Sequence, residues 1–207
     1  MKKILLALFA LLSITAGAKS DVDSKYLAGA VPEENGMVVF RKSFRVPGKS
    51  QQDVLAGVKD FVVNDLVGKG IEGLRTRVIS DGQEGGLVVA RVEEWMVFKN
   101  KPLYLDRTRF RYQVSAKVTG DKVEMEISQI SYYYAEQTDG TKGESYKAEE
   151  WITDQAAIAK SGKKLYPRSG KFRKKTIDRA EEIFALAIDK FEVKRTVEVR
   201  SGVVVTE

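Results

Sequence analysis

The sequence has neither cysteine nor histidine among its 207 residues. Without cysteine the chain can form no disulfide bond, and it has no thiolate that could act as a nucleophile or bind a metal. Without histidine it lacks the most common general base near neutral pH and the usual ligand of zinc and copper. A Ser-His-Asp triad and the standard zinc sites are therefore excluded, and we expect neither a metal nor another cofactor.

The sequence also lacks the short motifs that hold nucleotides or calcium. It contains no phosphate-binding loop, no dinucleotide-binding glycine fingerprint and no EF-hand loop. The segment Asp81-Gly82-Gln83-Glu84-Gly85-Gly86 matches none of them closely and indicates a hairpin turn. The remaining classes are a binding protein and, as the alternative, an enzyme that works through carboxylates or a hard metal.

Two pairs of adjacent acids bear on that alternative. Glu93-Glu94 precedes Trp95, and Glu149-Glu150 precedes Trp151. Paired carboxylates can serve a hydrolase acting on envelope or dietary glycans, or can bind a hard metal. Neighbouring residues of a strand point to opposite faces, so Glu93 and Glu94 cannot converge on one substrate atom without a bulge. We therefore assign no catalytic residue and favour ordinary strand alternation.

The first residues have the pattern of a secretory signal peptide. Lys2 and Lys3 precede an apolar run over 4–14, and the small residues of 16–18 suit signal peptidase. The run is shorter than the about 20 residues that span a bilayer. We expect a signal peptide over 1–18, export to the periplasm or beyond, and no transmembrane segment after cleavage. Because a lipoprotein signal needs a cysteine, we do not expect a lipoprotein.

The remaining chain has the length and composition of one globular domain. About 150 residues per domain is the usual size, and such a chain can bury a sufficient core without disulfides. Hydrophobic residues make up 43% and charged residues 31% of the sequence, which are ordinary proportions. The net charge of +6 includes Lys2 and Lys3, so cleavage would leave +4. This mild excess does not by itself indicate a nucleic-acid partner.

Hydrophobic periodicity predicts an α+β domain over 37–191, preceded by a flexible lead-in over 19–36. A strand over 38–46 is followed by a helix that Ser50 can cap and that ends at Gly68. Short turns then separate four alternating runs. They predict an antiparallel meander of strands over 75–80, 87–98, 104–118 and 122–134.

Two further helices are predicted after the meander, on the same face of the sheet. Thr153 or Asp154 can cap a short helix that runs to Ala159. A long helix starts near Lys171, with an apolar side that should pack on the sheet. The tail over 192–207 alternates between valines and charged residues. It is predicted to add a strand to the sheet, and the alternatives are a strand that awaits a partner or a frayed end.

The turn at Gly120-Asp121 predicts the register of the last two meander strands. With a two-residue loop, Val118 faces Val123 and Lys117 faces Glu124, so apolar and oppositely charged pairs both match. The other face of the first of these strands should see water or a ligand, because alternate residues point away from the core. It carries a basic stripe of Arg107, Arg109 and Arg111.

Aromatic residues extend this candidate binding surface. Continuing the same register sets Tyr132 opposite Arg109 and Tyr134 opposite Arg107, which predicts a cation–aromatic ladder able to hold sugars, anionic glycans or another protein. The alternatives are plain cross-strand pairing and a bulge near Gln129. Such a bulge would turn this side of the strand inward.

A second basic group lies at the start of the long helix. Lys171, Arg173, Lys174 and Lys175 occupy its first turns, where cations oppose the helix dipole. They could meet acidic lipid headgroups or an anionic polysaccharide. We favour a solvated face instead, since Asp178 can pair with Lys174 and further acids follow.

Three segments together with the order of elements resemble a known family. They are F-R-V-P-G-K-S at 44–50, E-E-W-I-T-D at 149–154 and K-F-R-K-K-T-I-D-R-A-E-E-I-F at 171–184. The chain resembles the DUF4468 family of secreted Bacteroidetes proteins, a domain of unknown function with a TBP-like fold, over 37 to about 191. The resemblance implies that fold and a secretion route, and it supplies no catalytic residues.

The fold implied by this resemblance does not imply a nucleic-acid partner. The TATA-binding fold presents a sheet to DNA, but architecture does not transmit function and an exported protein meets little DNA. We expect a non-enzymatic binding or assembly module of the cell envelope. Its partner is an envelope protein or a glycan that the sequence does not name, and no oligomeric state follows from the sequence.

Overall fold

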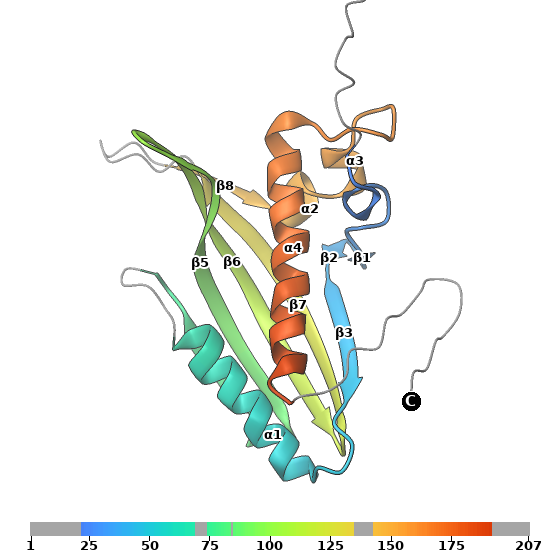
Figure 1. The fold of residues 1–207 in the computed structure, drawn as a ribbon, viewed down its shortest axis with the longest axis vertical. Coiled ribbons are helices and arrows are strands. Elements are labelled where there is room, and N and C mark those ends of the chain that lie inside the picture. Colours follow the sequence, from blue (N-terminus) through green and yellow to red (C-terminus); the bar gives the residue numbers. More distant parts are fainter. Residues whose placement is uncertain (1–21, 69–73, 84, 135–142, 192–207) are drawn as a thin grey trace, which may run out of the picture.

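A computed structural model of the chain describes residues 22–68, 74–83, 85–134 and 143–191 (Figure 1). The predicted signal peptide and the predicted C-terminal strand lie outside these residues. None of the helices in the described parts is both long and apolar enough to cross a bilayer.

The described residues form one six-stranded antiparallel sheet in the order β3-β7-β6-β5-β4, with β8 also paired to β7. The predicted α+β class and the meander are confirmed. The strands of this sheet are β3 Phe40–Arg45, β4 Arg77–Asp81, β5 Leu87–Lys101, β6 Tyr104–Thr119, β7 Lys122–Tyr134 and β8 Glu144–Lys147.

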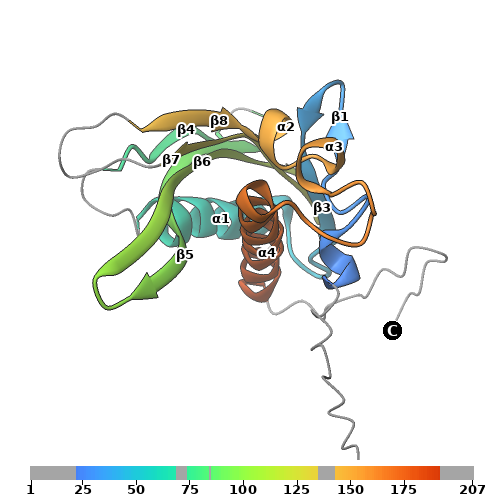
Figure 2. The same ribbon diagram turned by 90° about the horizontal axis from the view of Figure 1, so that it is seen from above.

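Helices cover one face of this sheet and leave the other face open, as Figure 2 shows. The predicted placement of the helices is thus confirmed. A capping box starts the first helix, in which Ser50 Oγ accepts a hydrogen bond from the Asp53 N–H. The helical elements are α1 Gln51–Asp60, its π-helical continuation η2 Phe61–Val67, α2 Ala148–Trp151, α3 Asp154–Ala157 and α4 Pro167–Asp189.

The core lies between the sheet and the two long helices. Buried valines of α1 and a buried aromatic and aliphatic face of α4 meet alternate residues of β5, β6 and β7. Phe172 is central to it, since its ring lies 5.0 Å from that of Tyr132 and 4.6 Å from that of Phe98. One-sided burial of this kind leaves the opposite side chains of each strand available for a site.

The long helix begins earlier than predicted, at Pro167 rather than near Lys171. Proline suits the first helical turn because its missing N–H would have no partner there. Gly170 permits this start, since a Cβ atom at that position would lie 2.6 Å from the Cβ of Leu165. The extra turn brings the helix against the segment that precedes it.

The lead-in differs from the flexible segment that we predicted. From residue 22 onward it packs on the domain, through η1 Ser24–Tyr26 and the hairpin of β1 Glu33–Glu34 with β2 Met37–Val38. Tyr26 Oη donates a hydrogen bond to Asp178 of α4 at 2.8 Å. The polar composition of the lead-in did not predict this packing, because only a few of its residues make the contacts and their partners lie in distant parts of the chain.

The β6–β7 register agrees with the prediction near the turn and departs from it further along. Val118 pairs with Val123 and Lys117 with Glu124, as predicted. The register then shifts between Arg111 and Gln113, where Gln129 adopts a φ of 52°. This is the β-bulge considered as an alternative, and every later side chain of β7 changes face because of it.

The predicted pairing of Tyr132 with Arg109 and of Tyr134 with Arg107 is therefore wrong. Tyr132 pairs with Phe110, and Tyr134 pairs with Thr108, on the covered side of the sheet. The Tyr132 ring is 1% exposed, and its hydroxyl shares a 2.7 Å hydrogen bond with Thr176 Oγ1. Neither tyrosine belongs to the open face.

Candidate functional site

The basic stripe of β6 lies on the open face, where the sequence placed it. Arg107 is exposed, and Arg109 and Arg111 are half-buried by their neighbours. Aromatic rings do accompany these cations, but they come from other positions. The Arg107 guanidinium lies 3.7 Å from the centre of the Trp95 ring, and Arg111 lies 5.7 Å from that of Tyr133.

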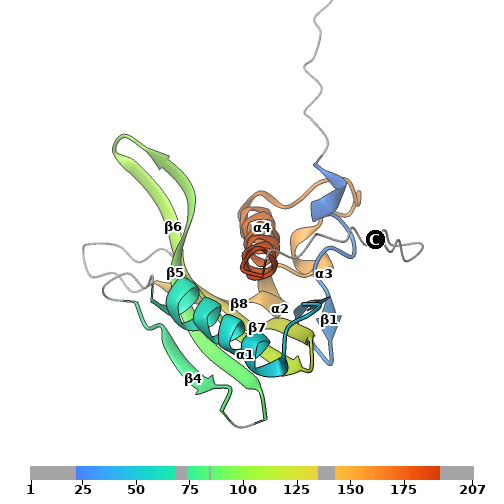
Figure 3. The same ribbon diagram turned by 60° about the horizontal axis from the view of Figure 1, so that its bottom comes forward.

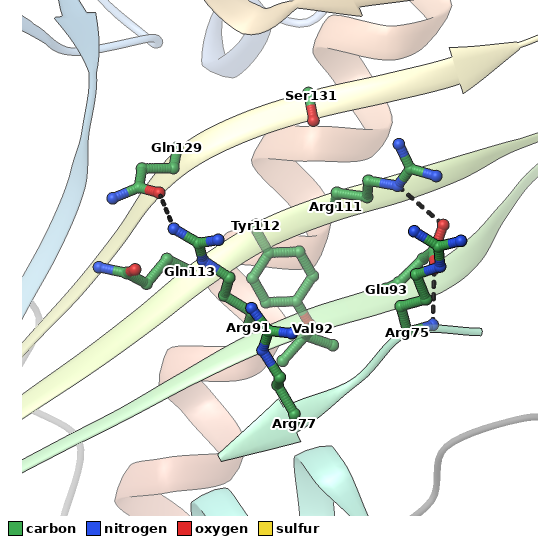
Figure 4. A pocket seen from close by; sticks show the side chains of 10 residues that line it. All are labelled: Arg75, Arg77, Arg91, Val92, Glu93, Arg111, Tyr112, Gln113, Gln129 and Ser131. Atoms are coloured by element: carbon green, nitrogen blue, oxygen red, sulfur yellow. Dashed lines mark hydrogen bonds and ion pairs between the residues drawn. The ribbon is translucent and has the colours of Figure 1, made fainter. Parts of the chain in front are cut away.

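A hollow of about 400 Å³ lies beside this stripe, across β4, β5, β6 and β7. Arginines from both sides surround it (Figure 4). Among the residues that line it are Arg75, Arg77, Arg91, Arg111, Gln113 and Gln129. Sequence reasoning missed the first three because only the β6–β7 pairing was worked out, whereas the hollow also needs β4 and β5.

Glu93 is the acidic residue of the hollow, and it is already bound by the protein. Its side chain is 1% exposed. Its Oε2 accepts a hydrogen bond from the Arg75 backbone N–H at 2.6 Å, and its Oε1 accepts one from Arg111 Nε at 2.8 Å. Thr76 Oγ1 holds the backbone by accepting from the Glu93 N–H and donating to the Glu93 carbonyl. These bonds fix both the carboxylate and Arg111.

Burial alone would raise the pKa of Glu93, but the hydrogen bonds from Arg75 and Arg111 and the nearby guanidinium charges lower the pKa below its ordinary value. The carboxylate therefore stays ionised at neutral pH. It cannot serve as a proton donor there, and its charge is compensated from within the protein.

We predict that Glu93→Gln lowers the free energy of unfolding by about 1–3 kcal/mol near neutral pH, because hydrogen bonds to a charged acceptor are lost. The folded pKa lies below the unfolded one, so this stabilisation is complete above the ordinary value of 4.5 and disappears as the pH falls through the folded pKa. Urea unfolding at neutral and acidic pH measures it. Glu150→Gln, at an exposed glutamate, is the control, and equal stability of the two variants at neutral pH would contradict the prediction.

The positive charge of the arginines around Glu93 exceeds the negative charge of its carboxylate. Four guanidinium groups line the hollow against one carboxylate, a net of three positive charges. Arg77 and Arg91 are direct cross-strand neighbours, an arrangement that is destabilising for like charges. Arg91 donates a 3.2 Å hydrogen bond to Gln129, and in the described structure the exposed Arg77 side chain has no hydrogen-bond or ion-pair partner.

Such a hollow can bind an anion. Guanidinium groups donate paired hydrogen bonds that match carboxylate, sulfate or phosphate oxygens. Gln113 and Ser131 add neutral polar groups that suit hydroxyls. The arrangement offers no proton donor paired with a nucleophile, because Glu94 lies on the opposite face, where Arg179 binds it through two hydrogen bonds of 2.8 and 2.9 Å.

The divergence of Glu93 and Glu94 confirms the strand alternation that we predicted. Glu149, of the other acid pair, accepts a hydrogen bond from the Val38 N–H. In the described parts of the chain, no three acidic side chains gather closely enough to hold a metal ion. The carboxylate alternative thus gains no support from the geometry.

The predicted basic patch of the long helix is not a single surface. Lys171 Nζ lies 2.8 Å from Asp106 Oδ2 and 2.7 Å from the Tyr134 hydroxyl, which ties α4 to the sheet. Arg173 is completely buried. Lys174 is partly covered and lies over the Tyr26 ring, while Lys175 is exposed. The four residues do not form a common basic patch, because the side chains of Lys171 and Arg173 point into the protein.

An antiparallel sheet with helices on one face and an open second face defines this protein as a TBP-like α+β domain. Residues 40–133 match the family described as a domain of unknown function, DUF4468, with TBP-like fold. A DUF4468 family protein from Bacteroides ovatus is 34% identical, with a TM-score of 0.73 over 86% of this chain and 100% of that chain. The chain belongs to the DUF4468 family, as its motifs indicated.

A second solved structure shares the fold at lower identity. A TBP-like protein from Parabacteroides distasonis is 20% identical, with a TM-score of 0.62 over 79% of this chain and 97% of that chain. At this identity the likeness concerns the fold alone. No curated protein matches the sequence.

Proposed function

We propose that this protein is an exported, non-enzymatic binding module of the bacterial cell envelope that holds an anionic group of a glycan in the hollow on its open face. The observation that carries the proposal is the opposition of Arg77 and Arg91, with Arg75 and Arg111 close by, while the one acid of the lining, Glu93, is already bound by Arg111 and the Arg75 N–H. A bound anion would relieve their repulsion.

The magnitudes favour a group of arginines over single surface charges. An isolated exposed ion pair contributes about 0–1 kcal/mol, which cannot hold a ligand. Hydrogen bonds to charged groups contribute about 1.5–3 kcal/mol each, and several can converge in one hollow. The N-terminal signal pattern supports an extracytoplasmic ligand, and Gln113 and Ser131 suit the hydroxyls of a sugar.

Binding to polygalacturonate and to dextran sulfate, with neutral dextran as the reference, tests the proposal. The double variant Arg77→Gln plus Arg91→Gln is expected to weaken binding of the preferred polyanion by at least about tenfold. The fold should persist, because the substitutions remove a repulsion. Calorimetric titration measures the affinity, and the two polyanions distinguish a carboxylate site from a sulfate site.

The matched control is Arg45→Gln plus Lys49→Gln, which removes the same charge from exposed positions outside the hollow. It should change the affinity by less than about twofold, since distant exposed charges are screened. Equal losses in the two double variants would show unspecific attraction and reject the proposal. Failure of both polyanions to bind at low ionic strength would also reject it.

A further inference from the structure

The tip of the β5–β6 hairpin exposes three consecutive apolar side chains. Leu103 is fully exposed, Tyr104 is 55% exposed and Leu105 is 50% exposed. Figure 3 shows this hairpin projecting away from the helices and from the rest of the sheet. Single exposed apolar residues are common, but a contiguous group at the end of a projecting element indicates a contact site.

The turn itself is not built for local stability. Lys101 pairs with Tyr104, so Pro102 and Leu103 are its two central residues. Leu103 has a φ of 65°, the left-handed conformation that a type II turn requires at this position and that glycine adopts without strain. A leucine that faces water in this conformation has neither a backbone nor a packing reason to be there.

The base of the hairpin is fixed, although its tip is free of contacts with the core. The register shifts at Phe98, whose ring packs 4.6 Å from that of Phe172. On the other strand, Asp106 accepts a hydrogen bond from Lys171. Both strands at the base of the hairpin are thus attached to α4.

Basic side chains surround the apolar tip. Lys99 and Lys101 are exposed on one strand and Arg107 on the other. The sole acid between residues 97 and 107 is Asp106, which is buried and bound by Lys171. The tip therefore combines exposed apolar side chains with surrounding positive charges. We call Lys99, Lys101 and Arg107 the collar.

We propose that this tip docks the protein on a bilayer of anionic phospholipid. A protein partner would need about 800 Å² of surface on each side, which three side chains on a convex tip do not supply. A bilayer suits the tip, because leucines enter the boundary of the acyl chains and tyrosine stays at the headgroups. Lysines near the surface are attracted to anionic headgroups. This inference is independent of the site in the hollow.

Vesicle flotation tests the docking with protein purified from an exporting host. Vesicles of phosphatidylcholine alone are compared with vesicles that also contain phosphatidylglycerol in equal parts. Binding is expected on the mixed vesicles and should weaken with added salt, since the collar acts electrostatically. The double variant Leu103→Gly plus Leu105→Ser should lower the partition coefficient by at least about tenfold. Glycine suits the backbone at position 103, so thermal unfolding should be unchanged.

The matched control is Ile79→Ser plus Leu87→Ser, which removes exposed apolar surface outside the tip. It should bind the vesicles as the parent protein does, and so should the Arg77→Gln plus Arg91→Gln variant. Equal binding by the tip variant and the parent, equal binding to both kinds of vesicle, or no binding to either kind would each overturn the proposal. A change of oligomeric state in the tip variant, without vesicle binding by the parent, would assign the tip to a second copy instead and also overturn it.

Discussion

Replacing Arg173 with leucine is expected to lower the free energy of unfolding by about 3–5 kcal/mol, because the change leaves buried acceptors without their donor. Arg173 is 0% exposed. Its guanidinium donates to the carbonyls of Tyr26, Leu27 and Ile152 and to Asp154 Oδ1, all at 2.6 or 2.7 Å. Three of these acceptors are backbone groups that no substitution can remove, so an apolar side chain cannot compensate for the loss.

Urea unfolding followed by circular dichroism measures this effect. Lys175→Leu is the control, because the same change at an exposed position two residues away is expected to stay within about 0.5 kcal/mol. The stability of Arg173→Lys should lie between those of the two leucine variants. A lysine ammonium keeps the positive charge but cannot bind all four acceptors that surround the planar guanidinium. If Arg173→Leu were as stable as Lys175→Leu, the buried guanidinium would not hold these segments together.

Inserting one alanine between Gln129 and Ile130 is expected to lower the free energy of unfolding by at least about 4 kcal/mol, because Ile130 and Tyr132 would leave the core. Both are now buried on the covered face of the sheet. One additional residue at the bulge shifts the end of β7 by one position along β6 and turns its side chains to the opposite faces. Polar Ser131 would then face the aromatic core around Phe172, and the Tyr132 hydroxyl would lose Thr176.

The control for this insertion keeps the chain length and changes only the side chain of Gln129. Gln129→Gly is expected to be neutral or slightly stabilising, because a φ of 52° suits glycine. Thermal unfolding and near-ultraviolet circular dichroism measure both variants. An insertion variant that melts as cooperatively and at the same temperature as Gln129→Gly would show that β7 tolerates either register.

The part of the sheet near the β6–β7 turn could be predicted because local signals agreed there. The loop Gly120-Asp121 sets a short connection, and the pairs on both sides of it match in polarity and charge. The bulge lacks such a signal, since glutamine is not a residue that marks a left-handed backbone. Its trace in the sequence is Ile130, an apolar residue that the unbroken register would have placed opposite Arg111.

The burial of Arg173 was also visible in the sequence, in a less direct way. The apolar stripe of the long helix includes Ile177 and Ala180 at helical spacing, and the same spacing continued backwards reaches Arg173. A charged residue on a core-facing stripe needs buried acceptors. Those acceptors lie in segments with no periodicity, so the sequence could not show which groups they were.

The hollow depends on pairings that link distant segments. The stripe on β6 was predictable from alternation alone, but Arg77 and Arg91 join it only through β4 and β5. Considered alone in the sequence, each of these arginines resembles an ordinary exposed residue of a strand. Their proximity in the structure follows from strand order, which periodicity does not determine.

The bond between Arg173 and the Tyr26 carbonyl joins residues 147 positions apart in the chain. Contacts of such long range form late, because a large loop must close before they gain any stability. A chain still under synthesis carries the N-terminal acceptors without the guanidinium that binds them. The N-terminal segment can therefore dock on the domain only after residues up to Arg173 have been synthesised.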